Sequence, residues 1–243
     1  MSRRMTRIAL ASACLAALSV TSRGLDDPKR PEGPNTAPPG AQKPKVDAKA
    51  KGVADLRLAA DLVAYGRQSR SPESLILAAK ILASTPVKPD GGTAQLVGGS
   101  AKPDPATPDA DAPDPAKLLA EARAMGGDEH VVAMIAEAAK IIAERSKGEI
   151  DGAAVRNGYV GPNGFANWTA VFRAGELASV TIAGSGGADF DLYVTDDRGN
   201  QICADTGPTA NATCTWYPSY TATFHFRVVN CSPFGSGYRF INN

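Results

Sequence analysis

Aromatic residues are confined to one end of this chain of 243 residues. Fourteen of its fifteen aromatic residues lie after residue 150, and only Tyr65 lies before it. Aromatic side chains bury large areas and dominate the cores that contain them. The part of the chain before residue 150 must therefore form its core from smaller, aliphatic side chains. Proline is equally uneven, because 13 of the 18 prolines lie in 28–44 and 86–115. The sequence therefore predicts a multidomain chain of mixed α and β class, with linkers between its modules.

The first 23 residues have the pattern of a secretory signal peptide. A short basic stretch precedes an apolar run from Ile8 to Val20, and Arg23 ends it. The run is shorter than the roughly 20 apolar residues that cross a bilayer. Cys14 also suggests a lipoprotein, but the apolar run continues past it. We therefore expect export to the periplasm or the exterior, with no transmembrane span in the mature chain.

The charges are balanced, with 26 basic and 25 acidic residues and a net charge of +1. Proteins that bind nucleic acid through its phosphates usually carry a clear basic excess. We therefore expect no nucleic-acid partner.

Two segments, 24–50 and 86–113, are rich in proline, glycine, alanine and charged residues. They are predicted to be a disordered linker and a low-complexity loop. The rest of 51–148 is predicted to form a helical module, because apolar residues recur there at helical spacing. Either a small helical bundle or a pair of helical-hairpin repeats fits this pattern, and we favour the bundle. The four expected helices cover 52–67, a segment capped by Ser71, a segment capped by Asp114, and 128–147.

The last part of the chain, 155–243, alternates apolar and polar residues in short segments. Glycine-containing turns separate these segments, which is typical of an antiparallel β-sandwich. We expect seven strands: Trp168–Phe172, Ala178–Ile182, Phe190–Val194, Gln201–Ala204, Thr213–Tyr217, Thr223–Val229 and Gly237–Ile241.

Parts of this module resemble a known bacterial family. Phe172–Glu176, Asp189–Val194, the turn Asp197–Asn200 and Phe224–Val229 together resemble the pre-peptidase C-terminal (PPC) domain over about 157–243. That family is a β-sandwich found at the ends of secreted bacterial proteins. The resemblance implies a non-catalytic accessory or binding domain. No peptidase domain is visible in this sequence, and the helical part resembles no family.

Asp189 and Asp191 are the candidate metal ligands, because they lie two residues apart on one face of a strand. Asp196, Asp197 and Asp205 are near in sequence, and carboxylate oxygens are the ligands that Ca²⁺ prefers. The spacing is not that of an EF-hand loop, and aspartates also cap turns and solvate outer faces. We favour this second interpretation and expect no other cofactor.

Tyr217, Tyr220 and Phe234 are the candidates for an exposed binding surface, whereas strand alternation places Trp216 in the core. No serine, histidine and carboxylate combine into a catalytic pattern, and Gly184–Gly186 lacks the spacing of a nucleophile elbow. We therefore expect an exported, non-catalytic protein that binds a protein or a polysaccharide of the envelope or the exterior. The alternative is a secreted hydrolase whose active site is not recognisable.

Three cysteines remain after removal of the signal peptide. We expect Cys203 and Cys214 to form a disulfide and Cys231 to stay a thiol, since export permits disulfides. Alternation within the two strands opposes this pairing unless a β-bulge intervenes. A Cys214–Cys231 disulfide and three buried thiols are the alternatives.

Overall fold

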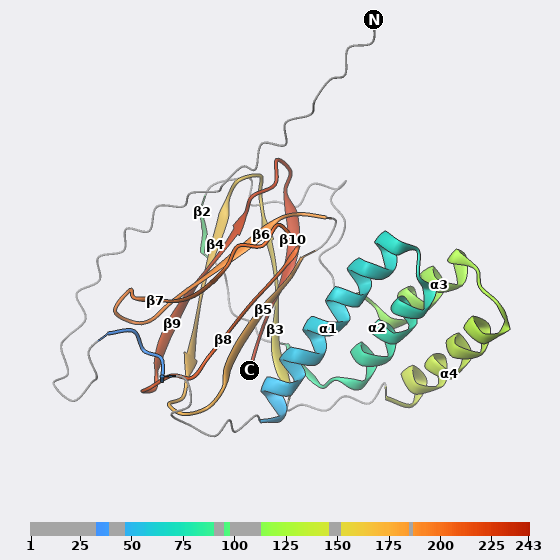
Figure 1. Cartoon of the computed structure of the whole chain (residues 1–243), viewed down its shortest axis with the longest axis horizontal. Helices are drawn as coiled ribbons and strands as arrows, with labels where there is room; N and C mark the ends of the chain where they lie inside the picture. Colours follow the sequence, from blue (N-terminus) through green and yellow to red (C-terminus); the bar gives the residue numbers. More distant parts are fainter. Residues whose placement is uncertain (1–32, 39–46, 90–94, 98–112, 146–151, 185–186) are drawn as a thin grey trace, which may run out of the picture.

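The computed structural model describes residues 33–38, 47–89, 95–97, 113–145, 152–184 and 187–243 (Figure 1). In these ranges four helices lie beside two β-sheets that pack face to face. The predicted mixed class, helices followed by a β-sandwich, is confirmed. The predicted signal peptide, 1–23 with Cys14, lies outside the described residues. No helix in the described ranges is long and apolar enough to cross a membrane.

The second and third helices begin directly after their predicted caps, Ser71 and Asp114, whereas the first begins at Ala48, earlier than the expected residue 52. The Asp47, Ser71 and Asp114 side chains each accept a hydrogen bond from a first-turn backbone N–H. Proline follows the cap at the start of the second and third helices, where its missing N–H costs nothing. The four helices are α1 (Ala48–Ser69), α2 (Pro72–Ser84), α3 (Pro115–Met125) and α4 (Glu129–Arg145).

A hydrophobic cluster with many alanines joins the helices. α2 lies at its centre and contacts α1, α3 and α4. Small side chains let the helices approach closely. The larger buried residues are leucines and isoleucines: Leu75, Ile76, Leu118 and Ile135.

The sandwich consists of two five-stranded sheets. Sheet A has the order β1 (Val87–Pro89), β3 (Ala153–Val160), β10 (Ser236–Asn242), β5 (Ala178–Gly184), β8 (Asn211–Trp216). Sheet B has the order β2 (Gln95–Val97), β4 (Phe165–Phe172), β9 (Ala222–Asn230), β6 (Phe190–Thr195), β7 (Gln201–Asp205). Neighbouring strands are antiparallel except for β1 and β3, which are parallel.

All seven predicted strands are present, as β4 to β10, but three others were not predicted. β3 lies at the start of the sandwich. The short strands β1 and β2 fall inside the segment 86–113 that was predicted to be a loop. They form because each pairs with the outer strand of one sheet, β3 or β4, and three residues alone show no periodicity.

The linker prediction for 24–50 also needs correction. α1 already begins at Ala48, and Gly33–Pro38 lies against one end of the sandwich. Asn35 in this segment is fully buried. Hydrogen bonds to distant loops, not local apolar periodicity, hold the segment in place.

Aromatic side chains fill the space between the two sheets. Phe172 lies edge-on to Trp216, with ring centroids 5.0 Å apart, and Phe226 lies edge-on to Phe240 at 5.2 Å. Such edge-to-face pairs contribute about 0.5–1.5 kcal/mol each beyond the area they bury. This core explains why the aromatic residues of the sequence are concentrated in its last third.

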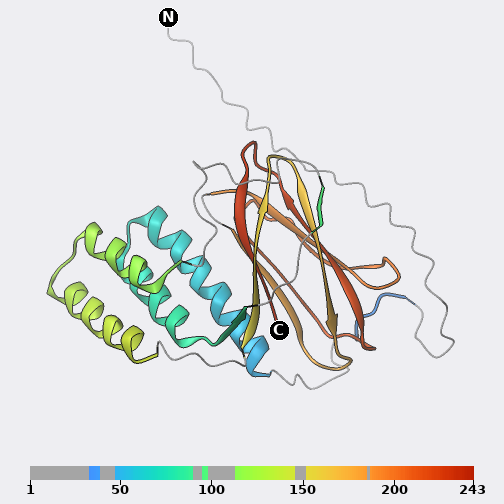
Figure 2. The same ribbon diagram turned by 180° about the vertical axis from the view of Figure 1, so that it is seen from behind.

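α1 covers part of the outer face of sheet A (Figure 2). Its buried Val53, Leu56 and Ala60 form one hydrophobic cluster with three small or aliphatic residues of the sheet, namely Ala153, Ala183 and Ile241. The helical part and the sandwich therefore share a core contact, so the two modules predicted from the sequence are packed together.

Candidate binding surface

None of the four described helices covers the outer face of sheet B, in contrast to that of sheet A. Figures 1 and 2 place the four helices on the side of sheet A. Along β4, β6 and β9 the apolar side chains point into the core, so the intervening side chains point outward. Six polar residues in the middle of this surface form what we name the open face: Asn167, Thr169, Tyr193, Thr195, His225 and Arg227. The exposed Val171 and its partner Thr223 lie beside them on the same side of the sheet.

The register of the strands arranges the open face in two rows. Arg227 lies opposite Asn167 on one side and Tyr193 on the other, and His225 likewise lies between Thr169 and Thr195. Neighbouring strands are about 4.8 Å apart, so each row spans about 10 Å. The face therefore offers hydrogen-bond donors and acceptors at the scale of one or two sugar rings or a few peptide residues.

Contacts with neighbouring side chains hold the two largest residues of the open face. The Arg227 guanidinium lies over the Phe165 ring, 4.5 Å from its centroid. The Tyr193 hydroxyl donates a hydrogen bond to Asp191 Oδ2 at 3.1 Å. Both side chains are half-buried, so their positions are restricted before any ligand arrives.

Asp189 and Asp191 lie at one end of the open face. Asp191 is buried, and its Oδ2 also accepts a hydrogen bond from the Cys231 thiol at 3.5 Å. Asp189 Oδ1 is inaccessible to solvent and has no hydrogen-bond partner. Burial raises the pKa of Asp189, and the negative charge of Asp191 raises it further. The predicted pair is therefore close together.

The other aspartates near this pair in sequence have separate structural roles. Asp196 is fully buried and accepts hydrogen bonds from the backbone N–H groups of Arg198 and Asn200. Asp197 accepts a hydrogen bond from the Tyr220 hydroxyl, and Asp205 accepts them from the backbone N–H groups of Gly207 and Thr213, which follow β7. Within the described ranges no three acidic, histidine or cysteine side chains form a group suited to a metal ion.

The three aromatic candidates do not share one surface. Tyr217 and Tyr220 precede β9, whereas Phe234 follows it, so the nine residues of the strand separate them by about 30 Å. Tyr220 packs against the core, and its hydroxyl is bound to Asp197. Phe234 is exposed on the loop between β9 and β10. Tyr193, which lies in a row with Arg227, was not among the residues selected from the sequence.

Cys203 and Cys214 form the predicted disulfide. The strands that carry them belong to different sheets, and both side chains point into the space between the sheets because they pair with the buried Val194 and Val180. A β-bulge beside Val194 shifts the register of β7, so Cys203 points inward although Gln201 points outward. Cys231 is not part of a disulfide.

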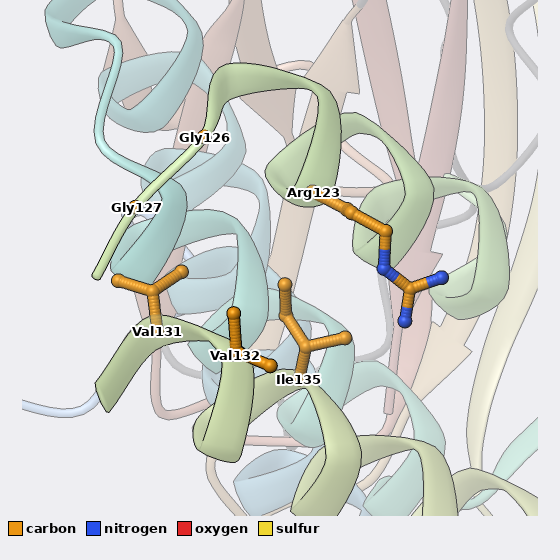
Figure 3. A pocket seen from close by; sticks show the side chains of 6 residues that line it. All are labelled: Arg123, Gly126, Gly127, Val131, Val132 and Ile135. Atoms are coloured by element: carbon orange, nitrogen blue, oxygen red, sulfur yellow. The ribbon is translucent and has the colours of Figure 1, made fainter. Parts of the chain in front are cut away.

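A shallow apolar hollow lies apart from the sandwich, where the turn after α3 meets α4 (Figure 3). It encloses about 180 Å³ and is lined by Val131, Val132, Ile135, two turn glycines and Arg123. The side chain of Val131 lies directly beneath Gly127, where a Cβ atom would be 2.6 Å away. The hollow holds one cation and no acid or nucleophile, so its lining suggests no chemistry.

Comparisons with known proteins leave the family open. No family model matches the chain, and no curated protein matches it. One similar solved structure is described as TmCBM61 in complex with beta-1,4-galactotriose. It has 16% sequence identity and a TM-score of 0.24, and the match covers 36% of this chain and 68% of that one. So low a TM-score carries no argument about what this chain binds.

Proposed function

We propose that this chain is an exported, non-catalytic binding protein whose open face binds a polysaccharide. The observation that carries the proposal is the difference between the two sheets. α1 packs on the outer face of sheet A, whereas sheet B presents two ordered rows of polar side chains to solvent. The outward-facing side chains of sheet B do not form part of the core, so they are available to contact a ligand.

The chemistry of the open face suits a sugar chain. Sugar hydroxyls both donate and accept hydrogen bonds, and the arginine fork, the asparagine amide and the threonine hydroxyls supply both kinds of partner. The ring of Tyr193 has an apolar face and a polar hydroxyl, which suits contact with the C–H face of a sugar ring. Arg227 and Tyr193 are neighbours across two strands, so one sugar residue would contact both.

The disulfide supports an oxidising location. Disulfides persist in the periplasm and the exterior and are rare in the cytosol. The Cys203–Cys214 bridge and the predicted signal peptide both support export of the protein. We further propose that the sandwich is a PPC-like accessory domain, on the sequence features of 157–243. The envelope or the exterior would then supply the ligand.

The test is retention on insoluble polysaccharides, followed by titration with soluble oligosaccharides of any that bind. We expect Tyr193→Ala and Arg227→Ala each to weaken binding about tenfold or more, which corresponds to about 1.4 kcal/mol. Tyr65→Ala is the matched control, because Tyr65 is an exposed tyrosine on α1.

Two outcomes would contradict the proposal. If the protein is retained on none of the polysaccharides, or if the two variants bind as well as the wild type, the open face is not the sugar site. Release of reducing ends during the incubation would mean that the protein is a hydrolase.

A further inference from the structure

Asn35 is an asparagine whose whole side chain is bound by the sandwich. It is fully buried although its neighbours in sequence form no helix or strand. Its Oδ1 accepts hydrogen bonds from the backbone N–H groups of Ser219 and Tyr220, at 2.9 and 3.0 Å. Its Nδ2 donates a hydrogen bond to the carbonyl oxygen of Tyr220 at 3.0 Å. Both ends of the amide are therefore recognised.

The backbone around Asn35 is bound as well. The Asn35 N–H donates a hydrogen bond to Asp196 Oδ2 at 3.0 Å, and the Ala37 N–H donates one to the Tyr217 carbonyl at 2.7 Å. Asn200 Nδ2 is 3.4 Å from the carbonyl oxygen of Gly33. These contacts hold a short segment at three positions and do not depend on its side chains.

Hydrogen bonds within the sandwich hold most of the groups that bind Gly33–Pro38. Asp196 is fixed in the β6–β7 turn by the backbone N–H groups of Arg198 and Asn200, at 2.9 and 2.8 Å. The loop that carries Ser219 and Tyr220 is fixed by the Tyr220 hydroxyl, which donates to Asp197 Oδ1 at 2.9 Å. The binding groups are therefore largely in place before the segment arrives.

We infer that this end of the sandwich is a peptide-binding site specific for asparagine, and that Gly33–Pro38 occupies it as an internal ligand. An aspartate in place of Asn35 would have no N–H for the Tyr220 carbonyl and would bring a carboxylate next to Asp196. An alanine would leave the two loop N–H groups without their partner. The Asn35 side chain therefore determines the specificity of the site, and the backbone contacts of the segment contribute affinity that does not depend on its sequence.

The internal ligand competes with any external peptide of the same chemistry. A tethered segment has an effective concentration in the millimolar range, so an external peptide gains access only when the segment is released. The site is separate from the open face, because it is made by the β6–β7 turn and the loop between β8 and β9. Its test is therefore independent of polysaccharide binding.

The experiment uses the full chain and a fluorescein-labelled peptide of residues 31–40. We expect the peptide to bind the Asn35→Ala protein, in which the internal ligand is weakened, and to bind the wild type at least about tenfold more weakly. Thr36→Ala is the matched control in the same segment and should behave like the wild type. A peptide with aspartate in place of Asn35 should not bind.

Hydrogen exchange gives a second readout. The amides of Ser219 and Tyr220 should exchange at least about tenfold faster in Asn35→Ala than in the wild type, and saturating peptide should restore their protection. Equal peptide binding by both proteins, equal binding of the aspartate peptide, or unchanged exchange at both amides would overturn the inference.

A variant with intact Asn35 covers the case in which Asn35→Ala does not fold. A protease site inserted in 39–46 separates the internal ligand from the rest after folding. Saturable, asparagine-dependent rebinding of peptide 31–40 to the cleaved protein supports the inference, and absence of rebinding refutes it.

Discussion

Cys203 and Cys214 link two strands that lie in different sheets, β7 of sheet B and β8 of sheet A. Both strands are at the end of their sheet's strand order, so the disulfide closes one side of the sandwich. The two strands are joined by a short loop that crosses from one sheet to the other, and the sequence separation of the cysteines is 11 residues. The bridge therefore holds the sheets together at the edge where, among the described strands, each sheet ends.

Loss of this disulfide should destabilise the sandwich. Closing a loop of about 12 residues removes chain entropy from the unfolded state, worth roughly 3 kcal/mol in the loop-entropy model. We expect Cys203→Ser with Cys214→Ser to lower the free energy of unfolding by about that amount in urea denaturation. Cys231→Ser is the control and should change it by less. A linked peptide containing Cys231, found by mapping under non-reducing conditions, would contradict the assignment.

The buried hydrogen bond between Trp168 and Tyr238 is a second test of the core. The Trp168 Nε1–H donates to Tyr238 Oη at 2.7 Å, and both side chains are buried between the sheets. Tyr238→Phe leaves the indole N–H without a partner, so we expect it to cost about 1–3 kcal/mol. Tyr65→Phe, at an exposed tyrosine, should cost almost nothing. Equal unfolding midpoints for the two variants would mean that the bond contributes nothing net.

The main strands could be predicted because alternation is local. Except for β7, where a bulge lets the adjacent Ile202 and Cys203 both pack against the core, each of β4 to β10 has one face in an aromatic core, so apolar residues recur at about every second position. β3 escapes this rule: its Gly158 lies opposite Tyr238, where a Cβ atom would be 2.4 Å from the tyrosine ring, and Ala153 packs beneath α1. Small residues of β3 are required where Tyr238 and α1 lie close to its backbone, and β3 makes contacts on both of its faces. Its sequence therefore shows no clear alternation of apolar and polar residues.

The two proposed binding surfaces depend on contacts between distant parts of the chain. Tyr193 and Arg227 are both outward-facing by alternation, but only the strand order brings β6 beside β9 and makes them neighbours. Asn35 is 161 residues from Asp196 and 185 from Tyr220, and nothing in its surroundings in sequence distinguishes it from other linker residues. The bulge that allows the disulfide is likewise a property of paired strands.

The contact between α1 and sheet A should couple the helical part to the sandwich. Leu56 is 1% exposed and belongs to the cluster that contains Ile241 of the sheet, whereas Leu58 on the same helix is 50% exposed. We expect Leu56→Ala to lower the free energy of unfolding by about 2–5 kcal/mol. Leu58→Ala should stay within about 0.5 kcal/mol. If both variants melt like the wild type, α1 does not stabilise the sandwich.

Thermal melting tests the calcium alternative at Asp189 and Asp191, against our favoured interpretation that these aspartates cap turns and solvate an outer face. Two carboxylates supply only part of the six to eight oxygen ligands that Ca²⁺ takes, so water would complete the shell and binding would be weak. If calcium binds at this pair, CaCl₂ should raise the melting temperature only near millimolar concentrations. The double variant Asp189→Ala with Asp191→Ala should abolish the effect. A shift that persists in that variant, or one reproduced by NaCl of equal ionic strength, would exclude this site.

Asp189 should make stability depend on pH. Its raised pKa means that the folded state binds the proton more tightly than the unfolded state, whose pKa is about 3.9. The resulting stabilisation is complete below that unfolded value and is lost as the pH rises through the folded pKa. Asp189→Asn keeps the size of the side chain and removes the charge. We therefore expect the variant to melt at a higher temperature than the wild type at pH 7 and at nearly the same temperature at pH 3. An equal difference at both pH values would show that the substitution acts through packing and not through the charge.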